Sequence, residues 1–204
     1  MQPTDRPYHH GNLRDTLIEA AVRLARTGGP DAVVLRAVSR EAGVSHNAAY
    51  RHFADHDDLL GAVSEYCMLK LAALMLERTN AVRVRAKGPR ANARLNTVGR
   101  AYVEFARTEP GWFKTAFSAA PGSPEVSAEG EPALGPFDLL SARLDELVEA
   151  GVLPAERRPG AEFAAWSMVH GLSTLLVDGP LRFLPDAEAQ ALITAVLEVV
   201  KRGL

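Results

Sequence analysis

Hydrophobic residues recur along most of the chain at intervals of three and four positions, which is the spacing of one face of an α-helix. The first such stripe runs through Leu13, Leu17, Ala21 and Leu24 and stops at Gly28-Gly29. No segment alternates apolar and polar residues as a half-buried strand would, and no internal repeat is present. The pattern therefore predicts an all-α fold of about nine helices.

Capping pairs and glycine or proline residues predict where these helices begin and end. Asn12 with Asp15, and Asp55 with Asp58, have the spacing of helix N-caps. The predicted helices cover residues 12–28, 35–42, 46–53, 55–79, a fifth ending near 108, a short sixth opening at 110, 137–150, one around 163–176 and one from 191. The Gly88-Pro89 pair is predicted to break the arginine-rich connection after the fourth helix, and residues 118–136 are predicted to be a loop.

Residues 37–60 predict two short helices joined by a tight turn. Gly43 stands where the first helix must stop, and glycine adopts the left-handed conformation without steric cost. Ser45 is a good N-cap for the second helix, because its hydroxyl can accept a hydrogen bond from an N–H two or three residues later. Ala49 and Phe53, four residues apart, share the buried face. The arrangement is typical of a helix-turn-helix, which lays its second helix in the major groove of DNA.

Several motifs then point to one family. They are the Leu17-x-x-Ala20-Ala21-x-x-Leu24 spacing, Gly28-Gly29, the turn at residues 42–45, Tyr50-x-His52-Phe53 and Leu59-Leu60. On these motifs, residues 8–66 resemble the N-terminal DNA-binding domain of the TetR family of transcriptional regulators. Further along are Tyr102-x-x-Phe105-Ala106 with Pro110, Phe113 and Phe117, and then Trp166-x-x-Val169-His170-Gly171. This half resembles the family branch whose ligand domain is named after its Trp-His-Gly motif.

The resemblance implies a helix-turn-helix domain over residues 8–60 and a ligand-binding and dimerisation domain over residues 61–204. The expected DNA contacts lie on and around the recognition helix 46–53: Arg36, Ser45, His46, Asn47, Ala48, Tyr50, Arg51, His52 and His56. Asparagine can bond adenine bidentately in the major groove. In relatives, residues at the positions of Arg36, Tyr50 and His52 bond phosphates. A solvated surface without DNA contacts is the alternative.

Four positions depart from the family's usual pattern, of which Ser39, in place of an alanine, is a small change. His56 stands where lysine is common, and a histidine is mostly neutral at pH 7, so its phosphate contact is expected to be weak or pH-dependent. Val34 replaces the common serine or threonine and removes a side-chain cap from the second helix. Ala49 replaces a larger leucine. Together these departures leave the affinity and the operator sequence open.

The C-terminal half contains the residues expected to line a small-molecule site, since such sites are apolar with a few polar groups. They are Tyr102, Phe105, Trp112, Phe113, Phe117, Trp166, Met168 and His170. Stripes at helical spacing are more often ordinary core, which is the alternative for each of them. The last two helices carry apolar residues on more than one side, which suggests a partner surface. In the family they form the homodimer interface; closing the monomer core is the alternative.

Composition and charge narrow the class of protein. The chain has 204 residues, of which 47% are hydrophobic and 24% charged, so it is expected to be globular. The net charge is −2, and residues 1–60 contain no lysine but five of the six histidines, so weak non-specific DNA binding with a shallow salt dependence is expected. The lone Cys67 excludes an internal disulfide and a cysteine-based zinc site. Neither a signal-peptide core nor a membrane-length apolar run is apparent, so we expect a cytoplasmic protein without a membrane partner.

These observations predict a regulator rather than an enzyme. No nucleophile–base pair, paired carboxylates or phosphate-binding glycine loop is visible, and no cofactor is expected. His52 and His56 have helical spacing, but the cap at Asp55 should separate them, so no metal site is expected either. The predicted function is a homodimeric repressor that binds a pseudo-palindromic operator and is released by a small molecule. The alternatives are an activator of the same architecture, and a small-molecule-binding or enzymatic helical protein that keeps the helix-turn-helix only as a scaffold.

Overall fold

Helices make up all the regular secondary structure that the computed structural model describes, which is residues 13–119 and 134–203. In chain order the elements are α1 (Leu13–Gly28), η1 (Pro30–Ala32), α2 (Leu35–Glu41), α3 (His46–Ala49), α4 (His56–Asn80), α5 (Lys87–Thr108), α6 (Pro110–Ala116), α7 (Pro136–Glu149), η2 (Ala155–Arg157), α8 (Ala161–Val177) and α9 (Asp186–Gly203). The all-α prediction is confirmed.

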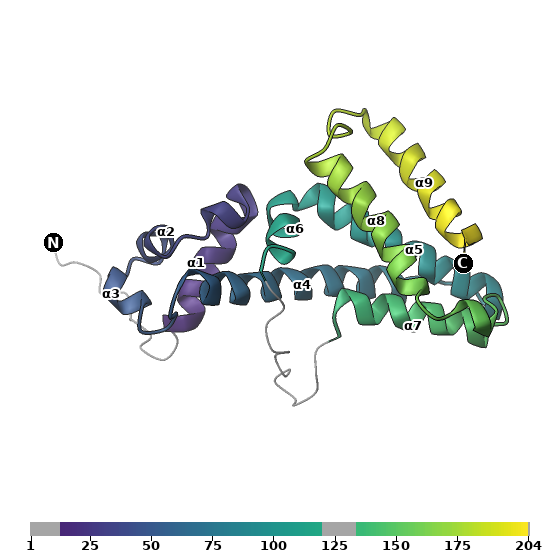
Figure 1. The fold of residues 1–204 in the computed structure, drawn as a ribbon, viewed down its shortest axis with the longest axis horizontal. Helices are drawn as coiled ribbons and strands as arrows, with labels where there is room; N and C mark the ends of the chain where they lie inside the picture. The colour runs from purple at the N-terminus through teal and green to yellow at the C-terminus, as the bar shows by residue number, and fades with distance from the viewer. Residues whose placement is uncertain (1–12, 120–133, 204) are drawn as a thin grey trace.

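The helices form two groups connected by α4 (Figure 1). At one end α1, α2 and α3 form a group with the start of α4. At the other end α5 and α7 pack on its second half, α8 packs on α5 and α7, and α9 packs on α5 and α8, with α6 in between. The N-terminal group buries Leu17, Val38, Ala49, Phe53 and Leu59 completely. The second half of the chain has its own apolar core, so α4 connects two cores.

The start of α4 is fixed by the predicted cap. The Asp55 carboxylate accepts a hydrogen bond from the Asp58 N–H at 2.9 Å, and the Asp58 carboxylate accepts one from the Ala54 N–H at 3.0 Å. These reciprocal bonds satisfy two backbone donors that the helix leaves without an internal partner. They fix the N-terminal end of α4 directly after the helix-turn-helix segment.

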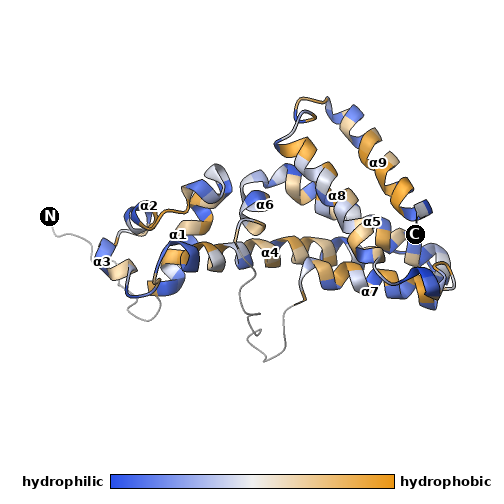
Figure 2. Cartoon of the chain, in the orientation of Figure 1, coloured by the Kyte–Doolittle hydropathy of each residue, from blue (hydrophilic) through white to orange (hydrophobic). Residues whose placement is uncertain are grey.

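Helix α4 is apolar along most of its length (Figure 2). It is the one described helix with the length and composition to cross a membrane, and 44% of the relevant window is buried inside the protein. Val63 and Cys67 lie in the N-terminal core, and Leu71 and Met75 lie in the C-terminal core. Burial raises the pKa of the Cys67 thiol to about 12, which keeps it protonated. The apolarity of α4 is thus explained by its contacts with both cores.

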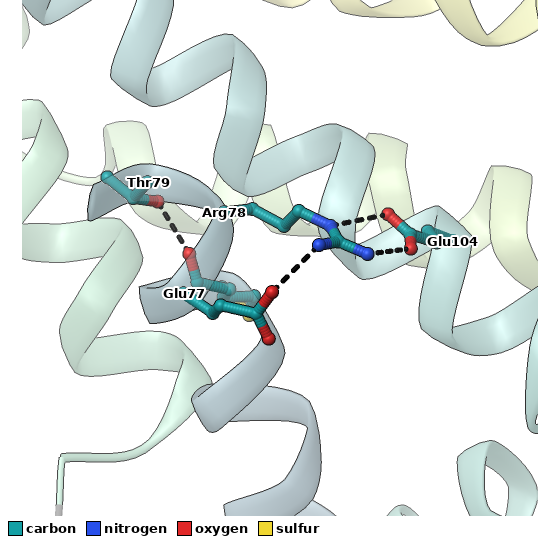
Figure 3. Close-up of polar contacts among 5 residues, drawn as sticks. Glu77, Arg78, Thr79 and Glu104 are labelled. Atoms are coloured by element: carbon teal, nitrogen blue, oxygen red, sulfur yellow. Dashed lines mark hydrogen bonds and ion pairs between the residues drawn. The ribbon is translucent and has the colours of Figure 1, made fainter. Parts of the chain in front are cut away.

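The far end of α4 is tied to α5 by an ion pair (Figure 3). The Arg78 guanidinium donates to both carboxylate oxygens of Glu104, at 3.3 and 2.7 Å, and to Glu77 at 2.9 Å. Nearby, the Thr79 hydroxyl donates to the Met75 carbonyl at 2.6 Å. The two-pronged geometry orients α5 across α4, although the partial exposure of both side chains keeps its contribution to stability small.

Helix α6 joins the two groups. The Trp112 indole N–H donates to the Val22 carbonyl of α1 at 2.9 Å, and the Ser64 hydroxyl of α4 donates to the Ala116 carbonyl at 2.8 Å. Arg26 of α1 pairs with Glu109 at 2.7 Å and lies over the Trp112 ring. At Gly111 a Cβ would overlap the backbone oxygens of Ala25 and Arg26, so only glycine lets the two helices approach this closely.

Some predicted boundaries differ from the structure. The third helix is regular only over His46–Ala49, and Gly88-Pro89 lies in the first turn of α5 instead of breaking the connection, because proline is tolerated where backbone N–H groups lack helical partners. Val34 caps α2 without a side-chain bond, as expected. The cap at Asn12 and most of the loop at residues 118–136 lie outside the described residues.

Replacing Gly111 with alanine should destabilise the protein. The added Cβ would force α6 away from α1, and such overpacking costs about 1–3 kcal/mol. Urea unfolding followed by circular dichroism measures the effect. Gly61→Ala is the control, since a Cβ there meets nothing within 4 Å and should leave stability equal or slightly higher. Equal midpoints for both variants would contradict the close α1–α6 contact.

Candidate DNA-reading helix and ligand cavity

The turn before α3 has the predicted geometry. Gly43 adopts a φ of 70°, and the Val44 N–H donates to the Ser39 carbonyl at 2.9 Å. The Ser45 hydroxyl accepts from the Ala48 N–H at 3.2 Å and caps α3. The turn and the cap that the sequence predicts are therefore confirmed, and they fix the direction of α3 relative to α2.

Helix α3 continues as a hydrogen-bonded turn. The N–H groups of Arg51 and His52 donate to carbonyls three residues earlier, at 3.3 and 2.9 Å, and the Phe53 N–H donates to the Ala49 carbonyl at 3.1 Å. Three-residue spacing is that of a tighter helix, which explains why the regular helix ends at Ala49. The backbone to Phe53 nevertheless stays coiled, so the side chains keep a helical arrangement.

Burial separates the two faces of this segment. Ala49 and Phe53 are completely buried, whereas the side chains of the neighbouring polar residues are exposed. The exposed set is Arg36, Ser45, His46, Asn47, Tyr50, Arg51, His52 and His56, with Ala48 partly buried. The His46 and Tyr50 rings pack edge to face at 4.7 Å. Every residue predicted to contact DNA is thus accessible, on α2, on α3 and its following turn, or at the first residue of α4.

Acidic residues lie beside the expected DNA contacts, and the prediction from sequence gave too little weight to their effect on the charge of this surface. The Nδ1 atom of His56 lies 3.0 Å from a carboxylate oxygen of Asp57, an exposed side chain. Asp55 and Asp58 form the reciprocal cap beside it. The acidic residues at the head of α4 therefore offset part of the positive potential that Arg36 and Arg51 provide.

A cavity of about 270 Å³ lies in the C-terminal half, between α4, α5, α7, α8 and α9. Of the residues predicted to bind a ligand, Tyr102 and Trp166 line it. Phe105, Trp112, Phe113, Phe117, Met168 and His170 are not in its lining. Phe105 is buried core, Trp112 belongs to the joint with α1, and Met168 is exposed on α8.

His170 lies behind the cavity wall and is hydrogen-bonded to the two aromatic residues that line it. The Trp166 indole donates to the Tyr102 hydroxyl oxygen at 3.2 Å, and the Tyr102 oxygen lies 2.7 Å from His170 Nδ1. We assign the Tyr102 proton to this second bond, because the hydroxyl still has one hydrogen to donate. Burial raises the pKa of Tyr102 and lowers that of His170, so both are neutral. The His170 ring then packs on Phe117 of α6, at 4.7 Å.

The polar lining of the cavity was missed by sequence reasoning. Asn92 and Asn96 of α5 and Lys201 of α9 line the cavity, and so does Gly99. The asparagines lie four residues apart on the helix face that also carries Gly99 and Tyr102. That spacing was visible in the sequence, whereas the approach of α9 to this face is a tertiary contact that no local pattern shows.

Two family models match the chain. The one described as "Bacterial regulatory proteins, tetR family" matches residues 17–63, and the one described as "Tetracyclin repressor-like, C-terminal domain" matches residues 95–200. The HTH-type transcriptional repressor Rv3405c of Mycobacterium tuberculosis (strain ATCC 25618 / H37Rv) is 32% identical over 75 residues, which cover 35% of this chain. The match spans 40% of that relative's length.

Solved structures match over nearly the whole chain. A protein with unknown function from Rhodococcus sp. RHA1 is 31% identical, with a TM-score of 0.75, over 98% of this chain and 99% of that one. The transcriptional regulator FadR from Bacillus subtilis, solved in complex with stearoyl-CoA, is 15% identical, with a TM-score of 0.62, over 93% of this chain and 98% of that one. The second likeness is one of fold alone.

His170 should make stability depend on pH. Because burial lowers its pKa in the folded protein, the unfolded chain binds the proton more readily, and stability is lost as the pH falls from about 6.5 through the lowered value. His170→Gln should flatten this part of the profile, with little change in slope above pH 7.5. Urea midpoints measured from pH 5 to 8 test this. Parallel profiles for the two proteins would rule out the contribution.

Proposed function

The chain belongs to the TetR family of bacterial regulatory proteins, and on that premise we propose that it is a DNA-binding transcriptional repressor. The observation that supports this most directly is the helix α3 with Ser45 as its cap. Ala49 and Phe53 anchor it in the core while His46, Asn47, Tyr50 and Arg51 face outward. A short helix fixed in this way suits the major groove. We place the protein in the cytoplasm, acting by binding and not by catalysis.

Each exposed residue has a proposed role at the operator. His46 and Asn47, in the first turn of α3, read base edges, since asparagine can bond adenine at N6 and N7. Arg36, Tyr50 and His52 bond phosphates, and Arg51 reaches a guanine or a phosphate. Ser45 and Ala48 at α3, and His56 at the start of α4, lie close to the sugar–phosphate backbone of the DNA. With few cations, binding releases few counterions and depends weakly on salt.

We propose that the protein works as a homodimer through α8 and α9. The outer face of α8 exposes Met168, Gly171 and Leu175, and that of α9 exposes Ala195 and Val199. Their spacing of three and four residues makes one stripe on each helix. A second copy would cover both stripes, and a two-fold axis there would present two α3 helices to half-sites about 34–36 Å apart.

The cavity supports release by a small molecule. Its walls include α4, which continues into the N-terminal group, and α9, which belongs to the proposed dimer interface. A ligand that favours one arrangement of these helices would change the spacing of the two α3 helices. Operator affinity would then fall by the coupling free energy, typically about 1–3 kcal/mol. The FadR structure with stearoyl-CoA shows that a protein of this fold can hold a ligand.

Removing two side chains of α3 should weaken operator binding. His46→Ala with Asn47→Ala takes away the proposed base contacts, and a bidentate contact contributes about 1–3 kcal/mol, so affinity should fall about tenfold or more. Fluorescence anisotropy on the intergenic DNA beside the gene, with random competitor DNA, measures this. Asn80→Ala, at the opposite end of α4, is the control and should bind normally. Equal binding by all three proteins would contradict the proposed DNA surface.

Charges placed on the outer faces of α8 and α9 should separate the protomers. Leu175→Glu with Val199→Glu buries carboxylates in the proposed interface, and sedimentation velocity should show a monomer with unchanged helical content. Leu76→Glu is the matched control, because Leu76 on α4 is 43% exposed, compared with 42% for Leu175. A dimer that persists in the double variant would place the interface elsewhere.

A further inference from the structure

The cavity has an uneven distribution of polar groups. Among its described lining residues, Lys201 is the one side chain charged at neutral pH. Asn92 and Asn96 lie on the first half of α5, and Lys201 lies near the end of α9. Because Gly99 packs on Leu197 and Arg100 bonds Thr194, α5 and α9 run in opposite directions, which brings Asn96 and Lys201 to the same end of the cavity. Most of the remaining lining is aliphatic, sulfur-containing or aromatic. Such a site suits a molecule with one polar group and an apolar body.

The polar end offers hydrogen-bond donors. The Asn96 amide oxygen already accepts from Arg100 Nε at 2.9 Å, so the group that Asn96 can still offer a ligand is its NH₂ donor. The Lys201 ammonium forms an ion pair with Glu198 at 3.5 Å, but both side chains are nearly half exposed, so the pair is weak and the ammonium stays hydrated at the cavity mouth. A cation beside an amide donor favours an anionic acceptor, and a carboxylate provides two acceptor oxygens.

The other end offers no unused donor of its own. The Trp166 indole N–H is bonded to the Tyr102 oxygen, and that hydroxyl is bonded to His170. Met75 and Val169 complete the wall there. A polar ligand group placed at this end would lose its hydration without gaining a partner. The ligand must therefore be apolar where it meets Trp166.

The size of the cavity limits the ligand further. At about 270 Å³ it lies just below the ~300–1,000 Å³ range of small-molecule sites. Between Asn96 and Tyr102, α5 approaches α9 so closely that a Cβ at Gly99 would lie 2.5 Å from a methyl group of Leu197. The space is therefore narrow as well as small, and a bulky nucleotide head group does not fit inside it.

We propose that the cavity binds an aliphatic monocarboxylic acid of modest length, with its carboxylate at Asn96 and Lys201 and its hydrocarbon chain against Met75, Leu140 and Trp166. The inference rests on the proposed function, because it takes this cavity to be the effector site of the regulator. The inference adds the chemical class of the effector and its orientation in the cavity. The carboxylate at the mouth would also touch α9, the helix proposed to form the dimer.

Calorimetric titration of the full chain with decanoate, without DNA, tests the proposal. The probe for comparison is 1-decanol, which has the same chain length and no charge. Decanoate should bind more tightly, and Lys201→Met should weaken decanoate about fivefold while leaving decanol unchanged, as expected for a half-exposed ion pair. Lys70→Met, on the exposed side of α4, is the control and should not change either affinity. Equal affinities for both probes in the wild type, or an unaltered decanoate affinity in Lys201→Met, would overturn the proposal.

A second variant tests where the chain lies. Ala165→Leu places extra volume in the cavity, beside Leu95 and Val200, and should weaken both probes, whereas Ala73→Leu, exposed on α4, should not. Circular dichroism and operator binding show that each variant is folded. Undiminished binding by folded Ala165→Leu, or no decanoate binding by the wild type, would overturn the proposal.

Operator affinity, measured separately, distinguishes the proposed ligand class from the proposed function. Decanoate binding that leaves operator affinity unchanged supports the ligand class and contradicts release, and operator binding without decanoate binding contradicts the ligand class alone.

Discussion

The contact of α6 with the backbone of α1 constrains every other part of the molecule. Gly111 brings the two helices together without a side chain between them, and Trp112 and Ser64 add hydrogen bonds to main-chain carbonyls. Main-chain partners cannot adopt another rotamer, so the N-terminal helices cannot turn unless α6 moves with them. The opposite face of α6 carries Phe117, which packs on His170. Movement at α1 is therefore connected by packed contacts to His170 behind the cavity wall.

Helix α9 has two faces with different proposed tasks. Its inner face supplies Leu197, Val200 and Lys201 to the cavity, while its outer face exposes Ala195 and Val199. Because Leu197 already lies against α5 at Gly99, there is little space for α9 to move inward. A bound molecule would therefore resist closure or move α9 outward, and either change would be felt at a dimer interface on the outer face. The proposed ligand response needs no other moving part on this side.

Helix positions were predictable because local rules determine them. The cap at Ser45, the positive φ at Gly43 and the cap at Asp55 depend on residues within a few positions of each other, and all three are confirmed. The cavity was not predictable in the same way. Aromatic residues were expected to line it, but Phe113 and Phe117 fill space in the core, whereas the cavity lies beside Gly99 and Ala165, where α5, α8 and α9 meet. Which gaps remain depends on how distant helices meet, and no periodicity in the sequence records this.

The head of α4 shows a conflict between folding and DNA binding. Asp55 and Asp58 satisfy backbone N–H groups and so fix the helix directly after α3, but they also put negative charge beside His56. In the proposed complex, the same carboxylates that hold α3 in place would repel the phosphates it approaches. With a weakened phosphate contribution, more of the affinity would have to come from base contacts in the groove. Such a balance would lower binding to random DNA more than binding to the right operator, and would favour selectivity over strength.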